Sequence, residues 1–427
     1  MSRLRSLSSL VLLLPLLSCG NEDTAKTSGT GSASTQPSKG PGAGAGYGYA
    51  ANLGDDLDKK AGDAIAKGKK WLLGKRDATT GSWPSKRDPE DYTVGTTAIA
   101  TLGLISSTPK EAVAGDAVIA QALDSLAAAQ KPNGAIYGNA RVVNYETSAA
   151  LAAFATARVP KFASVQAKAK DFLVSSQIQK DEASEEYGGF PYTDEEPGPT
   201  DLSNLQFALA ALHAEGVPAD HPVFARALKY LARVQNRSET NTFVTKVKEG
   251  DEVKEVVSGN DGGAYYSPGH GKVPLVKRAD GKFEVKSYGS MTYALLKCLL
   301  FAGVKADDPR VVAAVGWISK NFTVDRNPGF EATEDPVKQG AQGYYYYLRT
   351  MARALAEFEK ATGKELKVRD ADGKSHAWRR EVAAKIVSLQ KPDGSWVNAV
   401  ERWEEADPRL ATSFLLEALA TCQGRLP

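Results

Sequence analysis

The sequence predicts an all-α protein in which six helical hairpins close into an (α/α)6 toroid barrel. Two observations support this prediction. First, a turn that contains glycine and usually an aromatic residue recurs six times, with its glycines at Gly81, Gly134, Gly189, Gly263, Gly329 and Gly394. Second, a segment with helical periodicity precedes each turn and an Ala-rich segment follows it, so that the repeating unit is helix, turn, helix.

The segment before each turn has the pattern of an amphipathic helix. In "HPVFARALKYLARVQ", the apolar residues that fall on one helical face are Val223, Phe224, Ala227, Leu228 and Leu231. A helix of this kind buries one face and leaves the other in solvent. We therefore expect these six helices on the outside of the barrel.

The segment after each turn is apolar on nearly all sides, as in "ETSAALAAFATA" and "LSNLQFALAALHA". Such a helix must be buried on most of its faces, which places it inside. Six inner helices can close on themselves, so residues 50–427 are predicted to form one domain. The fourth hairpin carries an insertion near residues 241–287, in which alternating residues around "EGDE" and "RADGK" predict two β-hairpins.

The N-terminus has the pattern of an export signal. Arg3 and Arg5 precede the apolar run Leu10 to Leu17, which ends in Leu-Leu-Ser-Cys. This pattern predicts a signal peptide over residues 1–18 and export. The ending resembles the bacterial lipobox, which implies that Cys19 is lipidated and anchors the protein to a membrane, on the periplasmic or cell-surface side. Residues 19–49 are rich in Gly, Ser, Thr, Ala and Pro and predict a disordered tether.

Composition gives no reason to expect a nucleic-acid partner. The net charge is +2 and 24% of the residues are charged, without a strongly basic balance. Cys298 and Cys422 each lie in an apolar helical stretch. We therefore expect two buried thiols and no disulfide framework.

The repeated turn resembles a known family motif. Segments such as "QKPDGSW" resemble the QW repeats of the terpenoid cyclase and protein prenyltransferase superfamily, in particular the C-terminal part of squalene cyclases. The resemblance implies an α/α toroid, and it implies that the repeat residues Gln130, Gln177, Gln235, Gln390, Trp83 and Trp396 are structural. The first and fifth copies lack the Gln.

Candidate site residues lie near the starts of the inner helices. All six inner helices should begin at the same end of the barrel, so a cavity mouth there would be ringed by helix N-termini, which favour anions and carboxylates. The candidate catalytic residues are Asp88, Glu90, Asp91, Glu146 and Asp201, and the candidate cavity residues are Tyr92, Tyr145, Tyr288 and Tyr345. Because successive helical residues differ by about 100°, the run Tyr344 to Tyr347 cannot direct all four rings inward.

Three chemistries are open for these residues. Class II terpenoid cyclases use an Asp-x-Asp-Asp acid; that motif is absent, and "DPEDYT" at Asp88 to Thr93 is the nearest match. Glu146 and Asp201 could instead face each other across the mouth as the acid and base of a glycoside hydrolase. Asp201 is alternatively the N-cap of the third inner helix. Aromatic rings in the cavity could stabilise a cationic intermediate, or could simply pack between helices.

No cofactor or metal is expected. The four histidines, His213, His221, His270 and His376, show no ligand spacing. The first functional hypothesis is an exported, lipid-anchored squalene cyclase-like toroid that acts on or binds a polyprenyl or triterpenoid substrate. If it is active, it would be an isomerase or lyase of the cyclase/mutase type. The alternatives are a non-catalytic cell-surface toroid that binds a protein or glycan partner, and a carbohydrate-active (α/α)6 enzyme.

Overall fold

The computed structural model describes residues 53–87, 90–194, 198–249, 252–331, 333–370 and 372–425. These residues belong to one compact unit. The predictions for residues 1–49, including the signal peptide and Cys19, lie outside the described residues, and so does Asp88. Within the described ranges, no helix has the length and apolar character needed to cross a membrane.

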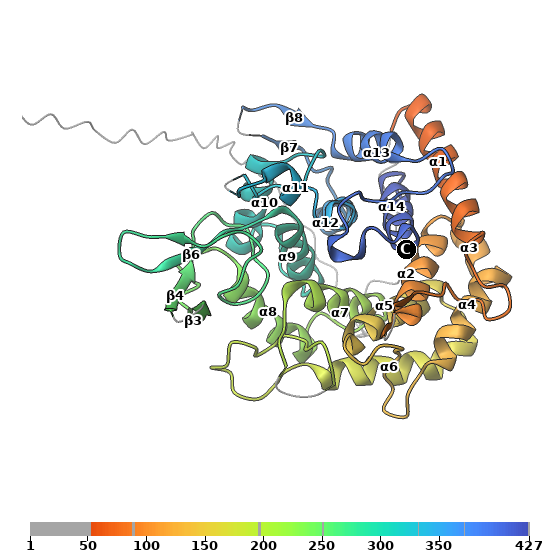
Figure 1. The fold of residues 1–427 in the computed structure, drawn as a ribbon, viewed down its shortest axis with the longest axis horizontal. Helices are drawn as coiled ribbons and strands as arrows, with labels where there is room; N and C mark the ends of the chain where they lie inside the picture. The colour runs from red at the N-terminus through yellow and green to blue at the C-terminus, as the bar shows by residue number, and fades with distance from the viewer. Residues whose placement is uncertain are drawn as a thin grey trace, which may run out of the picture. The chain divides into compact units, whose positions relative to one another are not determined.

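Six inner helices form a closed ring (Figure 1). They are α2 (Thr93–Ser106), α5 (Val143–Ala157), α7 (Leu202–Ala214), α9 (Gly289–Phe301), α12 (Tyr344–Thr362) and α14 (Pro408–Cys422). Each packs against the next along the chain, and α14 packs against α2 to close the ring. The predicted toroid barrel is confirmed.

Six outer helices surround this ring. They are α1 (Asp55–Leu73), α4 (Ala117–Ala128), α6 (Ala163–Ser176), α8 (Pro222–Val234), α10 (Pro309–Asn321) and α13 (Trp378–Leu389). Most of them lie over the groove between two inner helices; α4, for example, contacts α2 and α5, and α8 contacts α7 and α9. In Figure 1 the colour changes gradually around the ring, because outer and inner helices follow one another in chain order.

The burial of the two helix sets follows their sequence patterns. In α8, Val223, Phe224, Ala227, Tyr230, Leu231 and Val234 are buried, which is one face of an amphipathic helix. In α9, nearly every residue is buried. Cys298 and Cys422, both on inner helices, are buried free thiols, as expected.

The repeat glutamines connect neighbouring outer helices. Four side-chain N–H groups each donate to the carbonyl of a glycine in the turn and to a carbonyl of the next outer helix. The donors are Gln130, Gln177, Gln235 and Gln390, and the glycines are Gly134, Gly188, Gly262 and Gly394. For Gln390, the acceptors are Gly394 at 3.0 Å and Ala64 of α1 at 2.8 Å. This last bond joins the final repeat to the first, so the glutamines also help to close the ring.

The turns pack closely against neighbouring backbone. Gly134 has φ +94°, and a Cβ there would lie 2.4 Å from the Lys168 carbonyl oxygen of the next outer helix. A side chain is therefore excluded by space as well as by conformation. The turn is also fixed to the inner helix, since the Thr97 and Thr412 hydroxyls accept the N–H groups of Trp83 and Trp396, each at 3.0 Å.

The predicted insertion contains both expected hairpins. Strands β3 (Val244–Glu249) and β4 (Glu252–Ser258) form one hairpin, and β5 (Val276–Lys277) and β6 (Phe283–Val285) form the other. A parallel pairing of β4 with β6 joins them into one four-stranded sheet of order β3-β4-β6-β5. This pairing was not predicted.

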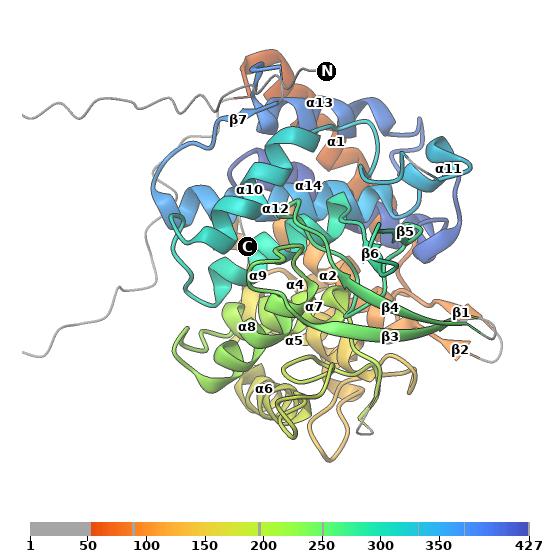
Figure 2. The same ribbon diagram turned by 90° about the vertical axis from the view of Figure 1, so that its left-hand side faces the viewer.

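Shorter elements complete the described part of the chain. They are β1 (Lys86–Arg87), β2 (Glu90–Asp91), α3 (Lys110–Val113), η1 (Pro160–Phe162), α11 (Pro336–Gly340), β7 (Val368–Arg369), β8 (Ser375–His376) and η2 (Arg402–Glu404). Figure 2 shows β1, β2, α11 and the four-stranded sheet on the same side of the helical ring. The cavity described below opens among loops that accompany these elements.

Candidate functional site

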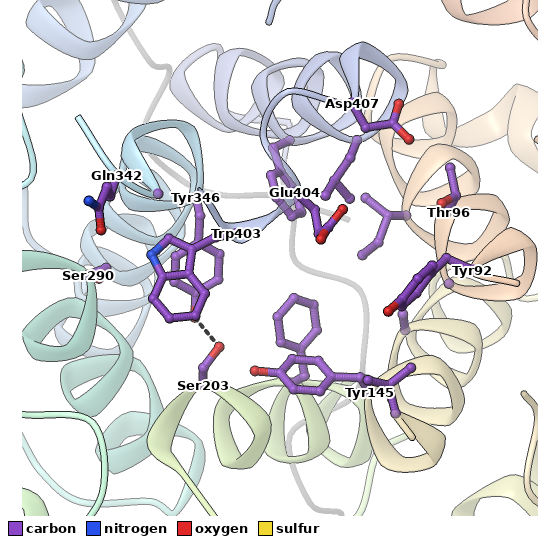
Figure 3. Close-up of a pocket in the computed structure, with 18 of the residues that line it drawn as sticks. Tyr92, Thr96, Tyr145, Ser203, Ser290, Gln342, Tyr346, Trp403, Glu404 and Asp407 are labelled. Carbon is purple, nitrogen blue, oxygen red and sulfur yellow. Dashed lines mark hydrogen bonds between the residues drawn. The ribbon is translucent and has the colours of Figure 1, made fainter. Parts of the chain in front are cut away.

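An aromatic cavity of about 420 Å³ lies at the end of the ring where the inner helices begin (Figure 3). Its volume falls within the range of about 300–1,000 Å³ that is typical of small-molecule sites. The aromatic residues that line it are Tyr92, Tyr145, Tyr192, Phe207, Tyr266, Tyr288, Phe330, Tyr346, Trp403 and Phe414. Aliphatic lining residues include Ile99, Ala149, Met291 and Leu410.

The positions of several rings follow from their places at the start of an inner helix or within one. Tyr92 and Tyr288 precede the first helical residues of α2 and α9, so they stand at the mouth. Phe207 and Phe414 lie more than one turn inside α7 and α14 and form the floor. Figure 3 shows Tyr92, Tyr145 and Trp403 on different sides of the cavity.

The tyrosine run of α12 sends one ring into the cavity, and this ring is Tyr346. Tyr345, the predicted cavity residue, is not among the lining residues; its hydroxyl donates to the Val397 carbonyl at 3.2 Å. The Tyr347 hydroxyl donates to the Thr323 carbonyl at 2.7 Å. Neighbouring tyrosines thus point to different sides, as the helical periodicity requires.

The floor rings form a connected cluster. The Phe207 ring centroid lies 5.3 Å from that of Tyr145 and 6.4 Å from that of Tyr346, and the Tyr346 centroid lies 6.2 Å from that of Phe414. These distances are typical of aromatic pairs in protein cores. The cavity therefore offers a ligand a packed aromatic surface.

Cations lie directly beneath this floor. The Arg349 guanidinium carbon is 5.2 Å from the Phe207 centroid and 5.1 Å from the Phe414 centroid. Arg349 Nε donates to Glu417 Oε2 at 2.6 Å, and Arg353 lies 3.6 Å from Glu417 Oε1. The buried Lys297 ammonium donates to Gln206, and burial, followed by repulsion from Arg349, lowers the pKa of Lys297 to about 7.

Glu146 is a buried carboxylate that organises backbone. Gly95 N–H donates to Oε1 at 2.9 Å, and the Gly138 and Asn139 N–H groups donate to Oε2 at 2.7 and 3.0 Å. Burial raises the pKa of Glu146, and these three backbone donors oppose that effect. The carboxylate lines the cavity, but its geometry is that of a group that fixes the start of α2.

The acidic residues of "DPEDYT" do not line the cavity in the described part of the chain. Glu90 accepts hydrogen bonds from Tyr92 and from Arg141. Asp91 Oδ1 accepts the Thr93 N–H at 2.9 Å, and the Asp91 side chain is 43% exposed. These contacts are typical of a helix start and differ from those of a desolvated acid.

Asp201 is the N-cap of α7 and lies behind the cavity wall. Its Oδ1 accepts the Asn204 N–H at 2.7 Å. Burial raises its pKa, and the neighbouring hydroxyls of Tyr192 and Tyr266, which are 2.6 Å apart, oppose that effect. Since α5 and α7 are adjacent in the ring, Glu146 and Asp201 stand on neighbouring helices and do not face each other across the mouth.

Glu405 and Asp407 hold the loop before α14. Glu405 is completely buried, and its carboxylate accepts the Tyr346 N–H at 2.6 Å and the Asn398 side-chain N–H at 2.7 Å. Burial raises the pKa of Glu405 to about 7, against these donors. Asp407 lines the cavity and pairs with Arg409 at 2.7 Å.

The lining residues that sequence reasoning missed come mainly from loops. Lys272 and Tyr266 belong to the insertion, and Trp403 belongs to the loop before α14. No repeat pattern marks them. Phe207 and Phe414 are predictable from the sequence as candidates, because a large ring about two turns into an Ala-rich inner helix must face either the cavity or a neighbouring helix.

No cluster of three or more His, Cys, Asp or Glu side chains that could hold a metal ion occurs in the described ranges. The cavity lining combines aromatic and aliphatic groups with hydroxyl, amide and a few charged groups at its mouth. It can therefore enclose an apolar ligand and orient a polar end.

Known proteins share the fold. No protein-family model matches this chain. No curated protein matches it either. A variant of the type II terpene cyclase MstE from Scytonema, in complex with geranylgeranyl dihydroxybenzoate, is similar with a TM-score of 0.53 and 16% identity, over 87% of this chain and 99% of that chain.

A second similar structure has a different activity. It is an inactive variant of the α-1,6-mannanase GH76A of Salegentibacter sp. HEL1_6, in complex with α-1,6-mannotetrose, with a TM-score of 0.53 and 11% identity over 85% of this chain and 99% of that chain. Identities this low establish architecture alone. The chain therefore has the α/α toroid fold that a type II terpene cyclase and an α-mannanase share.

Proposed function

We propose that this protein is an exported, lipid-anchored toroid of the terpenoid cyclase type that binds an isoprenoid ligand in its aromatic cavity. The observation that carries the proposal is the cavity itself, about 420 Å³ in volume and lined by ten aromatic residues. Burying apolar surface against such a wall favours binding by roughly 25 cal/mol for each Å² removed from water. The N-terminal pattern that ends at Cys19 supports export and lipid anchoring.

The floor favours binding over cyclisation. Proton-initiated cyclisation would create a carbocation, which aromatic faces stabilise. Here the Arg349 guanidinium, which pairs with Glu417, already lies against the rings of Phe207 and Phe414. These two rings already interact with a cation, so less of their charge stabilisation remains for a carbocation, and neither Glu90 nor Asp91 lines the cavity as a proton donor would. We therefore propose that the ligand is held unchanged.

The fold similarity to the cyclase supports an isoprenoid ligand only as an analogy, since MstE was observed with a geranylgeranyl compound. The mannanase supports the alternative of a glycan ligand, and aromatic rings with hydroxyl groups also suit sugars. The inactive mannanase has two aspartates with consecutive numbers replaced by alanine. Consecutive aspartates occur here only as Asp55–Asp56 and Asp307–Asp308, at the starts of outer helices and away from the cavity.

The test is to purify the full chain from membranes, extract it with organic solvent and identify the released compounds by mass spectrometry. The matched variant is Ala149→Phe, because Ala149 lines the cavity and a phenyl ring there would occupy ligand space. Both proteins carry the same N-terminus, so any lipid associated with an anchor is common to both. Thermal unfolding of the variant checks that its fold is kept.

An isoprenoid that is recovered in about equimolar amount from the native protein and depleted at least fivefold in Ala149→Phe would support the proposal. Equal recovery from both proteins would place the lipid outside the cavity and contradict it. Incubation with geranylgeraniol tests cyclisation separately: recovery of unchanged geranylgeraniol supports the proposed inactivity, whereas a cyclic product refutes it. Mannotetraose binding that is lost in the variant would favour the glycan alternative.

A further inference from the structure

Two loops that are far apart in the sequence meet at the mouth of the cavity. The first lies in the insertion between β4 and β5 and contributes Tyr266 and Lys272 to the lining. The second, residues 399–404 before α14, contributes Trp403 and Glu404. Neither loop belongs to the helical ring, so their contact is separate from the packing that forms the barrel.

A lysine joins the two loops through aromatic rings. The Lys272 ammonium lies 3.8 Å from the Tyr266 ring centroid and 5.1 Å from the Trp403 ring centroid, and the two rings are 6.5 Å apart. The two distances from the ammonium to the ring centroids are within the range of cation–π attraction. The buried carboxylate of Asp201 attracts the same ammonium, whereas Arg402, which lies over the Trp403 ring, repels it.

The Trp403 loop is fixed at its base and strained at its tip. At the base, Asn398 N–H donates to the Glu405 carbonyl at 3.0 Å, and the Asn398 side chain donates to the Glu405 carboxylate at 2.7 Å. At the tip, Trp403 and Glu404 both have φ +66°, a left-handed conformation that is unfavourable for residues other than glycine.

The exposure of Trp403 agrees with a movable tip. Its side chain is 43% exposed although it lines the cavity. The indole rests against Gly343, where an added Cβ would lie 3.2 Å from indole Cδ1. The Trp403 ring rests on the Lys272 ammonium and on Gly343, and the backbone beneath it is strained. A movement of the loop would therefore break few contacts.

From these observations we propose that Lys272, Tyr266 and Trp403 form a gate over the cavity, in which the Lys272 ammonium holds the two loops together and opening of the 399–404 loop admits the ligand. The gate rests on the proposed function in that it assumes a ligand that enters this cavity. It also restricts the ligand to one that fits beneath Trp403 when the gate is closed.

The first test uses N-phenyl-1-naphthylamine, a neutral dye that fluoresces in apolar sites, with stopped-flow measurement on the full chain. Lys272→Met should raise the association and dissociation rate constants together by about tenfold, equivalent to about 1.4 kcal/mol, while the Kd changes by less than twofold. Lys272→Arg keeps the cation and should keep the native rates. Lys131→Met removes a similar Lys–Tyr contact, 4.8 Å from the Tyr137 ring and outside the cavity, and should change nothing.

Unchanged rates in Lys272→Met would overturn the gate. So would a faster dissociation with an unchanged association rate, because that result would make Lys272 a direct ligand contact. Dye binding that persists in Ala149→Phe would count against the apolar cavity of the proposed function, which is a different failure.

The second test needs no ligand. Acetylation of lysines, followed by mass spectrometry, should modify Lys272 at least fivefold faster in Trp403→Ala than in the native protein, with Lys131 unchanged. Equal rates at Lys272 in both proteins would overturn the gate even if the dye bound normally.

Discussion

Replacing Glu405 by Gln should remove part of the pH dependence of the protein's stability. Glu405 is completely buried and accepts backbone N–H groups at the start of α12. Burial raises its pKa from an ordinary value of 4.5 to about 7. Below pH 4.5 the group is protonated in both the folded and the unfolded chain, so its contribution to stability is fully present. As the pH rises, the unfolded chain loses this proton first, and stability falls until the pH passes 7.

The magnitude follows from the two pKa values. The two pKa values differ by about 2.5, and each pKa unit corresponds to 1.36 kcal/mol. The free energy of unfolding therefore changes by about 3 kcal/mol over the whole range and by roughly 2 kcal/mol between pH 5 and pH 7.5. The pKa values of Glu146 and Asp201 are also raised by burial and act in the same direction. They remain in the variant, so the quantity to compare is the difference between the two pH slopes.

The assay is urea unfolding at pH 5 and pH 7.5, followed by far-UV circular dichroism. The free energy of unfolding of Glu405→Gln should fall by roughly 2 kcal/mol less than that of the native protein between these pH values. Glu401→Gln replaces an exposed acid in the same loop and should leave the native slope unchanged. The free energy of unfolding of Glu405→Gln and that of the native protein could instead change by the same amount between pH 5 and pH 7.5, within about 0.5 kcal/mol. Ionisation of Glu405 would then not cause the pH dependence, and the reasoning would be refuted.

Three further outcomes are expected. Gln390→Ala removes the bonds that join the last repeat to α1 and leaves two carbonyls without this donor, which should cost about 1–3 kcal/mol in urea unfolding; a loss below about 0.5 kcal/mol would count against the ring-closing role. Gly134→Ala should destabilise more than Gly216→Ala, because both have positive φ but only Gly134 has a backbone atom in the way; equal losses would show that backbone conformation alone decides. Cys298 and Cys422 should react with Ellman's reagent only in denaturant, because both thiols are buried and burial raises their pKa to about 12; prompt reaction of the native protein would contradict their burial.

Much of the fold could be predicted because its determinants are local and repeated. The periodicity of "HPVFARALKYLARVQ" places α8 outside, and the Ala-rich segments place the inner helices within. Strand alternation predicts the insertion's hairpins, but the pairing of β4 with β6 joins residues 27 positions apart, such as Val256 and Phe283, and leaves no local signal.

The candidate site was less predictable. Tyr92, Tyr145 and Tyr288 line the cavity because they stand at the starts of inner helices, which the repeat reveals. The sequence predicts Tyr345 in the cavity where the structure has Tyr346, because a shift of one residue, about 100° on a helix, is below the precision of a sequence-based helix boundary. Glu146 is a candidate acid by its sequence position, but its three backbone donors come from the first turn of α2 and from the loop before α5, and no sequence pattern specifies that these groups meet.

The sequence by itself determined the six-hairpin architecture, the buried thiols and the end of the barrel at which a cavity would open, since helical periodicity and turn chemistry act within a few residues. It also carries the N-terminal export pattern as a prediction. Only the tertiary structure decided which side chains form the cavity, that Arg349 lies under its aromatic floor, and that Lys272 meets Trp403 above it. Those contacts join residues from different repeats, so they arise only when the ring has closed.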